Sequence, residues 1–203
     1  MNESLSRQTI QAIAQRVAAH RKRQRLSLDR LAARAGVSKA SLAGLEKGTG
    51  NPGIALLCQT ASALGVSVSD LLEMSASRGA ETFALNGGEV LWRGPSGGSA
   101  RLVFGTHGPL MLELWEWEMF PGERYDAQAH SPGTKEILYP MRGRVGAVVR
   151  GEELVIRRGY GLFLETDAPH AYFCAGRQPS RFRMIVLEAP GSRNLTHNPE
   201  PVR

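Results

Sequence analysis

The stretch from Ser27 to Gly48 contains two short helix patterns joined at a glycine, and this pairing constrains the fold more than any other feature. Leucine and alanine recur at helical spacing in the first pattern, at positions 28, 31, 32 and 35, and Ser27 precedes them as an N-cap. Gly36 can take the left-handed conformation that ends a helix, and Ser38 can then cap the second pattern. We therefore predict two short helices joined by a tight turn.

A tight turn would press the apolar sides of these two helices together and leave a small, polar surface exposed on the second helix. That surface consists of Lys39, Ala40, Ser41 and Gly44. Small and polar groups on such a helix can approach base edges in the major groove of DNA. The pattern therefore predicts a recognition helix.

Apolar periodicity predicts three further helices around this pair. The first has its apolar stripe at positions 10, 13 and 17 and ends in the basic run 20–25. We expect the fourth to begin with Asn51 as its cap and Pro52 at its first position, and to end at Gly65. Ser67 is expected to cap a short fifth helix.

The positive charge of the chain is concentrated in the helical part. Residues 1–80 hold 11 Lys or Arg and 5 Asp or Glu, whereas residues 81–203 hold 14 of each, which together give the net charge of +6. The basic run, which includes Arg23, can neutralise phosphates and steepen the salt dependence of DNA binding. The alternative is a solvated basic helix end, which is favourable at the negative pole of the helix dipole.

Five helices with the second and third as the hinged pair resemble the phage-repressor class of helix-turn-helix domains, the Xre family, over roughly residues 9–74. The resemblance implies that the exposed surface of the recognition helix faces base edges, and that Ser27, Leu28 and Lys47 approach phosphates. It also implies that Arg21 pairs with Glu46. The glutamines common at the recognition positions are replaced by Lys39 and Ala40, so no base preference carries over. The predicted DNA-binding residues are Arg21, Arg23, Ser27, Leu28, Ser38, Lys39, Ala40, Ser41, Gly44 and Lys47.

The chain continues beyond the helical segment into a second domain of different character. We expect a helical domain over 1–74, a linker over 75–82, an all-β domain over 83–190 and a loosely held tail over 191–203. Short runs rich in β-branched and aromatic residues, separated by Gly and Pro turns, are typical of a sandwich or barrel. The expected strands are 89–93, 100–106, 110–119, 137–139, 145–150, 153–156, 161–165, 170–175 and 181–188. Trp115 and Trp117 alternate with glutamates, which predicts an aromatic face in the core or at a dimer surface.

Four polar residues in the β-rich half could form a metal site: Gln128, His130, Glu136 and His170. Residues two apart in a strand share a face, so Gln128 and His130 can point inward together, and Tyr172 and Cys174 can line a pocket beside His170. Two imidazoles and a carboxylate suit a divalent Zn, Fe, Mn or Ni ion. The alternative is that the histidines are unrelated and hydrogen-bond separate turns.

The frame Gly122-x5-Gln128-x-His130-x5-Glu136-x6-Gly143, followed by Gly159 and His170, resembles the two motifs of the cupin family over about residues 110–190. This family has the fold of a double-stranded jelly roll, and its motifs supply three His and one Glu to a metal. Here Gln128 stands where the first His would be, and the spacing from His130 to Glu136 is slightly long. The resemblance implies a multidomain α and β protein, with an all-α five-helix domain and an all-β jelly roll.

Together the two resemblances indicate a cytoplasmic one-component transcriptional regulator rather than an enzyme, whose cupin domain senses a small-molecule effector. Its expected partners are that effector, double-stranded DNA with a palindromic operator, and a second copy of the chain, with half-sites about 34 Å apart. No apolar run of membrane-span length occurs, so no membrane partner is expected. The first alternative is a cupin metalloenzyme, a dioxygenase or isomerase, with an accessory DNA-binding domain. The second is an antitoxin-like or nucleoid protein that binds DNA without an effector. We expect the linker to carry the effector signal to the recognition helices.

Overall fold

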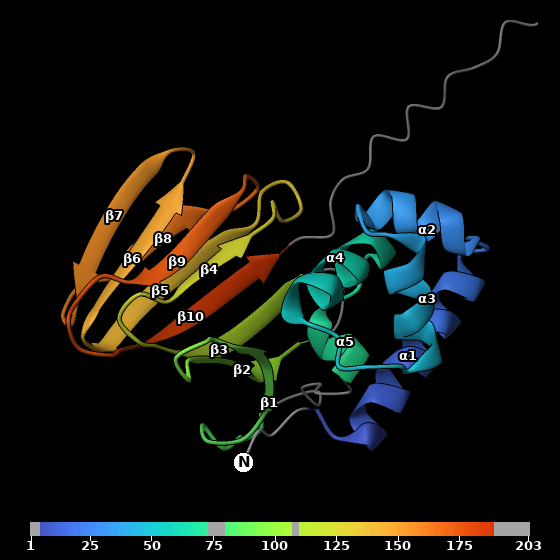
Figure 1. The fold of residues 1–203 in the computed structure, drawn as a ribbon, viewed down its shortest axis with the longest axis horizontal. Helices are drawn as coiled ribbons and strands as arrows, with labels where there is room; N and C mark the ends of the chain where they lie inside the picture. The colour runs from blue at the N-terminus through green and yellow to red at the C-terminus, as the bar shows by residue number, and fades with distance from the viewer. Residues whose placement is uncertain (1–4, 73–79, 107–109, 189–203) are drawn as a thin grey trace, which may run out of the picture.

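The computed structural model describes residues 5–72, 80–106 and 110–188, which form a helical domain beside a two-layered β domain (Figure 1). α4 and α5 lie next to the strands, whereas α2 and α3 lie on the side away from them. The predicted tail falls outside the described residues, as does most of the predicted linker. The helices are α1 (Arg7–Arg23), α2 (Leu28–Ala35), α3 (Lys39–Lys47), α4 (Ile54–Leu64) and α5 (Val68–Leu72).

The hinged pair predicted from the sequence is α2 and α3, with the expected caps. The Ser27 hydroxyl accepts from the backbone N–H of Arg30 at 3.2 Å, and that of Ser38 accepts from Ser41 at 3.0 Å. Gly36 ends α2 at φ 67°, in the left-handed region. Apolar side chains from every helix are buried together beneath this pair; they include Ile13, Val17, Leu31, Leu42, Leu45, Leu57 and Leu71. The helical domain therefore has its own core.

The predicted start of α4 is wrong. The helix begins at Ile54, after Gly53 in an extended conformation (φ −67°, ψ 156°) that makes no side-chain capping bond. Pro52 is buried before the helix, which begins two residues after the predicted first position. Ser67 does cap α5: its hydroxyl accepts from the N–H of Asp70 at 2.9 Å, and the Asp70 carboxylate accepts from the N–H of Ser67 at 2.8 Å.

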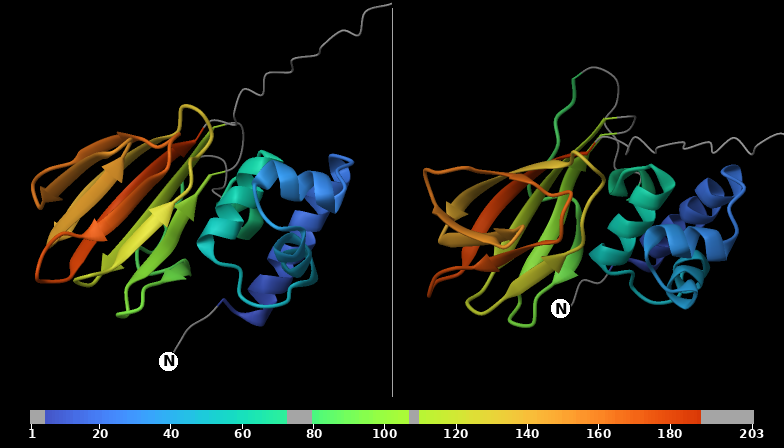
Figure 2. Two further views of the ribbon diagram at one scale, coloured as in Figure 1. Left: turned by 45° about the horizontal axis from the view of Figure 1, so that its top comes forward. Right: turned by 90° about the horizontal axis from the view of Figure 1, so that it is seen from above.

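Two antiparallel sheets form the β domain, in agreement with the predicted jelly roll (Figure 2). One sheet has the order β1-β2-β3-β10-β5-β8 and the other β4-β9-β6-β7. The strands are β1 (Glu89–Arg93), β2 (Ser99–Gly105), β3 (Met111–Met119), β4 (Arg124–Ala127), β5 (Lys135–Arg142), β6 (Arg144–Val149), β7 (Glu152–Arg157), β8 (Leu162–Glu165), β9 (His170–Cys174) and β10 (Ser180–Glu188). All nine predicted strands are present, and β4 was not predicted.

An aromatic cluster fills the space between the two sheets. Trp117 on β3 and Phe182 on β10 stack with ring centroids 5.8 Å apart, and Tyr172 on β9 of the other sheet lies 5.7 Å from Trp117. Trp115 and Trp117 are both buried, so the predicted aromatic face belongs to the core. Burial of such large rings fixes which faces of the strands point inward.

The helical and β domains contact each other directly through α5. The backbone N–H groups of Val68 and Ser69 donate to the Glu113 carboxylate at 3.1 and 3.4 Å. A Cβ atom at Gly105 would lie 2.2 Å from the Cβ of Ser69, so the helix and strand β2 can approach this closely only because residue 105 is glycine. A further hydrogen bond joins the hydroxyls of Ser62 on α4 and Ser131 at 3.0 Å.

Candidate functional site

The predicted recognition surface lies on α3, away from the β domain. Lys39, Ala40 and Ser41 are exposed and Gly44 is half-buried. The Lys39 ammonium lies 2.9 Å from a carboxylate oxygen of Asp29 on α2, and both side chains are largely exposed. The solvated pair contributes little to stability, so Lys39 can exchange this partner for another.

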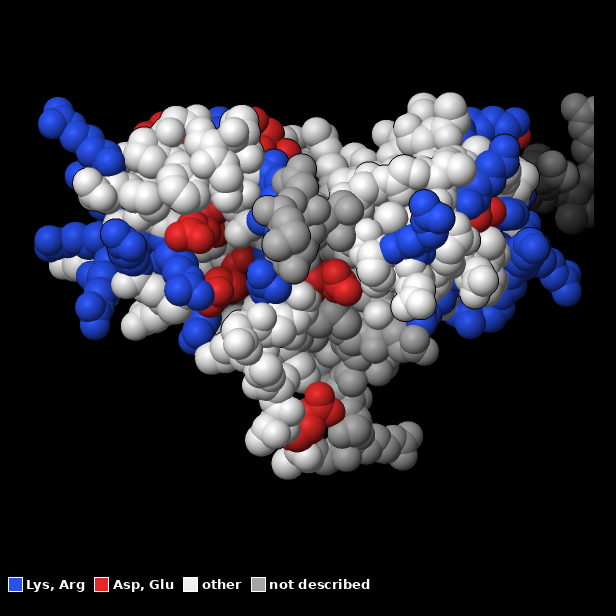
Figure 3. Space-filling model, turned by 60° about the horizontal axis from the view of Figure 1, so that its bottom comes forward, with Lys and Arg blue, Asp and Glu red and all other residues white. Residues whose placement is uncertain are grey.

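The other predicted DNA-binding residues surround this surface in different settings. Ser27, Arg23 and Lys47 are exposed, and Leu28 is half-buried. Arg23 contacts Nδ1 of His20 at 2.6 Å. The hydroxyls of Ser27 and Ser38 are already engaged as helix caps. Lys and Arg gather at the helical end of the molecule in Figure 3, and also at the far end of the β domain.

Arg21 has an internal partner rather than a free guanidinium. Its Nε and Nη2 donate to the two oxygens of Glu46 at 2.5 and 2.8 Å, and its Nη1 donates to the carbonyl of Leu26 at 2.8 Å. The pairing of Arg21 with Glu46 that the resemblance implied is therefore present. It ties the end of α1 to the end of α3, which fixes the position of the recognition helix.

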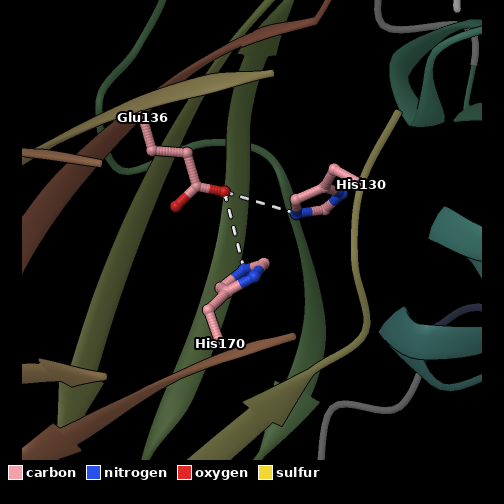
Figure 4. A group of neighbouring side chains, drawn as sticks. All are labelled: His130, Glu136 and His170. Carbon is pink, nitrogen blue, oxygen red and sulfur yellow. Dashed lines mark ion pairs between the residues drawn. The ribbon is translucent and has the colours of Figure 1, made fainter. Parts of the chain in front are cut away.

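Three of the four predicted metal ligands converge inside the β domain (Figure 4). His130 lies in the loop before β5, Glu136 on β5, and His170 at the first position of β9. Glu136 Oε1 lies 3.3 Å from Nε2 of His130 and 3.9 Å from Nε2 of His170. One ligand atom from each residue lies within 4.8 Å of the others, so these three residues can surround one ion. We call this group the His-Glu-His triad.

The chemistry of the donor set fits a divalent cation. Glu136 Oε1 and His170 Nε2 are buried without a hydrogen-bond partner, and a bound cation would satisfy both. The Nδ1 of His170 lies 2.8 Å from the carbonyl of Ala168, which places the proton there and leaves the Nε2 lone pair for a metal. The Tyr172 hydroxyl donates to the other oxygen of Glu136 and so holds the carboxylate in place.

Burial and mutual attraction shift the pKa values of the triad. Burial lowers the pKa of His170, which favours the neutral imidazole that binds metals. Burial opposes the charges on His130 and Glu136, but the attraction between the two groups outweighs it, which raises the pKa of His130 and lowers the pKa of Glu136. Without a cation these two residues therefore form an ion pair.

Gln128 and Cys174 are placed differently from the triad. Gln128 is exposed and borders the same cavity, and within the described residues it makes no hydrogen bond to the triad. The Cys174 thiol donates to the carbonyls of Gly176 and Gln178, and Cys174 is absent from the cavity lining. Tyr172 does line that cavity. The structure thus brings Tyr172 to the triad, but not Cys174.

A cavity of about 880 Å³ opens from the triad toward the helical domain. This volume lies within the range of small-molecule sites, about 300–1,000 Å³. The β domain contributes aromatic and acidic side chains, and the helical domain contributes residues of α2 and α4. Polar side chains in the lining include Arg34, Cys58, Gln59, Ser62 and Glu113.

The helical wall of this cavity and Glu113 were not predicted from the sequence. No sequence spacing connects α4 with the triad, because they are far apart along the chain. Glu113 had a usable signal: it shares its strand face with the inward-pointing Trp115 and Trp117. It is buried, it accepts a hydrogen bond from Trp115 Nε1 at 3.0 Å, and burial raises its pKa.

Residues 17–71 match the family HTH_3, described as helix-turn-helix. This segment of the chain, which covers α2, α3 and α4, is therefore a helix-turn-helix domain of the HTH_3 type. Among curated proteins it is similar to the HTH-type transcriptional regulator SutR of Escherichia coli strain K12. The two are 25% identical over 160 residues, which cover 79% of this chain and 85% of SutR.

Solved structures with the same arrangement include an HTH_3 family transcriptional regulator from Vibrio cholerae. It is 24% identical, covers 90% of this chain and 98% of its own, and has a TM-score of 0.69, which shows the shared fold of both domains. Two more distant likenesses have TM-scores below 0.5. The Cupin_2 domain of an XRE family regulator from Enterobacter cloacae (TM-score 0.36, 21% identical) covers 37% of this chain and 79% of its own. FeII HppE (TM-score 0.43, 17% identical) covers 89% of this chain and 100% of its own. Within the described residues, no helix is both long and apolar enough to span a bilayer.

Proposed function

We propose that this protein is a one-component, sequence-specific transcriptional regulator and not an enzyme. The effector is a small molecule bound in the cavity beside the His-Glu-His triad. The proposal depends on two features that occur in one chain. One is the exposed surface of α3 in a helix-turn-helix pair, and the other is a cavity whose lining includes buried polar atoms without a hydrogen-bond partner. Since its main partner is chromosomal DNA, we expect it to act in the cytoplasm.

DNA recognition is assigned to α3 and its surroundings. Lys39, Ala40, Ser41 and Gly44 would face base edges, and Ser27, Leu28, Ser38, Arg23 and Lys47 would lie near phosphates, with Arg21 holding α3 in place. One helix-turn-helix unit makes few base contacts, so we expect a homodimer on a palindromic operator with half-sites about 34 Å apart.

Selection from a random duplex library tests sequence-specific binding. On the selected site, Lys39→Ala should weaken binding more than it weakens binding to random DNA, because a base contact is lost. Arg23→Ala should weaken both about equally and flatten the slope of log affinity against log salt by about 1. Arg158→Ala, which removes an exposed arginine of the β domain, is the matched control. If no sequence is enriched over bulk competitor, the proposed function is wrong.

A divalent metal at the triad would be held by His130, Glu136 and His170, with Tyr172 orienting the carboxylate. When bound, the ion would offer open coordination positions to a donor atom of the effector. Elemental analysis of the purified protein should detect about one Zn, Fe, Mn or Ni ion per chain. His170→Ala should remove the ion, whereas His20→Ala should leave it. Equal metal content in all three proteins would contradict the assignment.

A metalloenzyme of the dioxygenase or isomerase type is the second candidate. Two imidazoles and one carboxylate, with open positions, are the ligand set of non-haem Fe(II) oxygenases. Turnover of a candidate ligand by the iron-loaded protein would favour the enzyme. Ligand-dependent operator affinity without turnover favours the regulator, and operator binding that no ligand alters would favour a purely architectural DNA-binding protein.

A further inference from the structure

We propose that the effector site is shared between the two domains, with α4 of the DNA-binding domain as one wall. A ligand at the triad would then set the angle of the recognition helix directly, without relying on the linker. This inference rests on the proposed function and adds the route of regulation. It assigns Cys58, Gln59 and Ser62 as positioning residues that face the ligand.

One edge of the domain interface is built as a fixed pivot. α5 is held against β2 and β3 by the two backbone donors to Glu113 and by the close approach of Ser69 to Gly105. Ser69 also donates to the carbonyl of Thr106 at 3.3 Å. Backbone hydrogen bonds and glycine contact leave α5 little freedom to slide on the strands.

The other edge of the interface is open. Between α4 and the triad lies the cavity of about 880 Å³, and the hydrogen bond that the structure places across this edge joins Ser62 to Ser131. The cavity continues to the end of α2, where Arg34 lines it and Arg34 Nη2 is buried without a hydrogen-bond partner among the described residues. Helices α2 and α4 therefore touch whatever fills the cavity.

One edge of the interface is a fixed pivot and the other borders a cavity. The presence of a ligand in the cavity is therefore coupled to the angle between the two domains. A ligand that fits one angle better than another shifts the population toward that angle, and no other contact is needed. Because α3 is packed on α2 and locked to α1 through Arg21 and Glu46, the recognition helix turns with the whole helical domain. The ligand that fits is a small organic molecule with a metal-binding donor at one end and hydrogen-bonding groups toward α4.

Side chains that fill the cavity from the α4 wall can act as probes while the ligand is unidentified. We compare Cys58→Ala with Cys58→Trp in the full-length chain, with Cys174 replaced by serine. Nitroxide labels at Gln15→Cys and Glu152→Cys report the distance between domains, and labelled chains are diluted with unlabelled ones. Ser62→Trp places the same bulk at a second point of the wall, and both this variant and the control below also carry Cys58→Ala so that only the two introduced cysteines are labelled. Ala19→Trp adds an indole on the exposed side of α1, outside the cavity, as the control.

We expect Cys58→Trp and Ser62→Trp to shift the inter-label distance away from that of Cys58→Ala, and Ala19→Trp to leave it unchanged. Without labels, the two cavity variants should change affinity for the selected DNA site by about fivefold or more, the lower end of allosteric coupling. Unchanged distance and affinity in whichever cavity variant unfolds cooperatively would overturn the inference. Absence of any preferred DNA site would instead refute the proposed function, and the distance measurement would still decide the pivot.

Discussion

At the scale of single residues, the guanidinium of Arg21 connects three segments of the helical domain. Its contacts to Glu46 and to the carbonyl of Leu26 use three nitrogens, and the side chains of Arg21 and Glu46 are 14% and 10% exposed. Removing one partner from a buried ion pair leaves a buried charge that nothing compensates. The pair should therefore matter more for the position of α3 than for contact with DNA.

We predict that Arg21→Met lowers the free energy of unfolding by about 3 kcal/mol, because it leaves the Glu46 carboxylate unpaired. The double variant Arg21→Met, Glu46→Met should be less destabilised than Arg21→Met alone, since no charge remains buried. Urea unfolding of the single and double variants measures both values. If the decreases in unfolding free energy of the two single variants simply add in the double variant, the two side chains do not interact.

The triad illustrates what residue types can predict. His130, Glu136 and His170 were found because strand parity and the cupin-like spacing select them, whereas Gln128, which the same spacing selects, is exposed at the cavity rim. Cys174 has the parity of Tyr172, but the adjacent turn offers its thiol two carbonyl acceptors. The alternation of side chains along a strand predicts the face on which a residue lies, but it does not predict the hydrogen bonds that the residue makes there.

At the scale of elements, the short helix α5 depends on a carboxylate from the neighbouring domain. Glu113 accepts from the first two backbone N–H groups of α5, and the Trp115 indole donates to its other oxygen. Burial raises the pKa of Glu113 in the folded protein, although these hydrogen bonds act in the opposite direction.

This pKa predicts a pH dependence of stability. A carboxyl whose pKa is raised on folding contributes stability that is fully present below its unfolded pKa, about 4.3, and is lost as the pH rises through the folded value. The difference in unfolding free energy between wild type and Glu113→Gln should therefore shrink or reverse as the pH rises through that window. Denaturant titrations from pH 4 upward, at about one-unit steps, measure it, with the exposed Glu165→Gln as control. A difference independent of pH would contradict the raised pKa.

Most elements followed from local pattern, and the exceptions have local causes. Alternation of buried and exposed positions marks long strands such as β3 and β5. In β4 only Ala127 of four residues is buried, so the strand carries no alternation that could be recognised. The start of α4 was misplaced because a proline fits both the first turn of a helix and the extended segment before it.

At the scale of the whole molecule, an apolar row crosses the outer face of the six-stranded sheet. Ile185 on β10 is paired with Leu114 on β3 and with Ile137 on β5, which in turn is paired with Phe163 on β8. Ile137, Phe163 and Ile185 are between 41% and 56% exposed. A contiguous exposed apolar surface of this kind is typical of an interface, and it suits the second copy of the chain in the homodimer that we propose.

We predict that Ile137→Glu or Ile185→Glu converts the dimer to monomers, because two copies of the new charge would face each other across the interface. Light scattering after size-exclusion chromatography measures the mass. Val155→Glu, at an exposed apolar position on the other sheet, should leave the mass unchanged. Dimers that persist in both single variants would place the interface elsewhere.

The seam between α5 and β2 has one more consequence. Because main-chain amides, one carboxylate, a glycine and the Ser69 hydroxyl make this contact, few substitutions can adjust it by small steps, and a methyl group at Gly105 would already collide with Ser69. The α4 wall at the opposite edge of the interface consists of side chains, so single substitutions can change its shape in small steps. During evolution, such a protein could therefore acquire specificity for new ligands through substitutions in the α4 wall, while the contact between α5 and β2 stays the same.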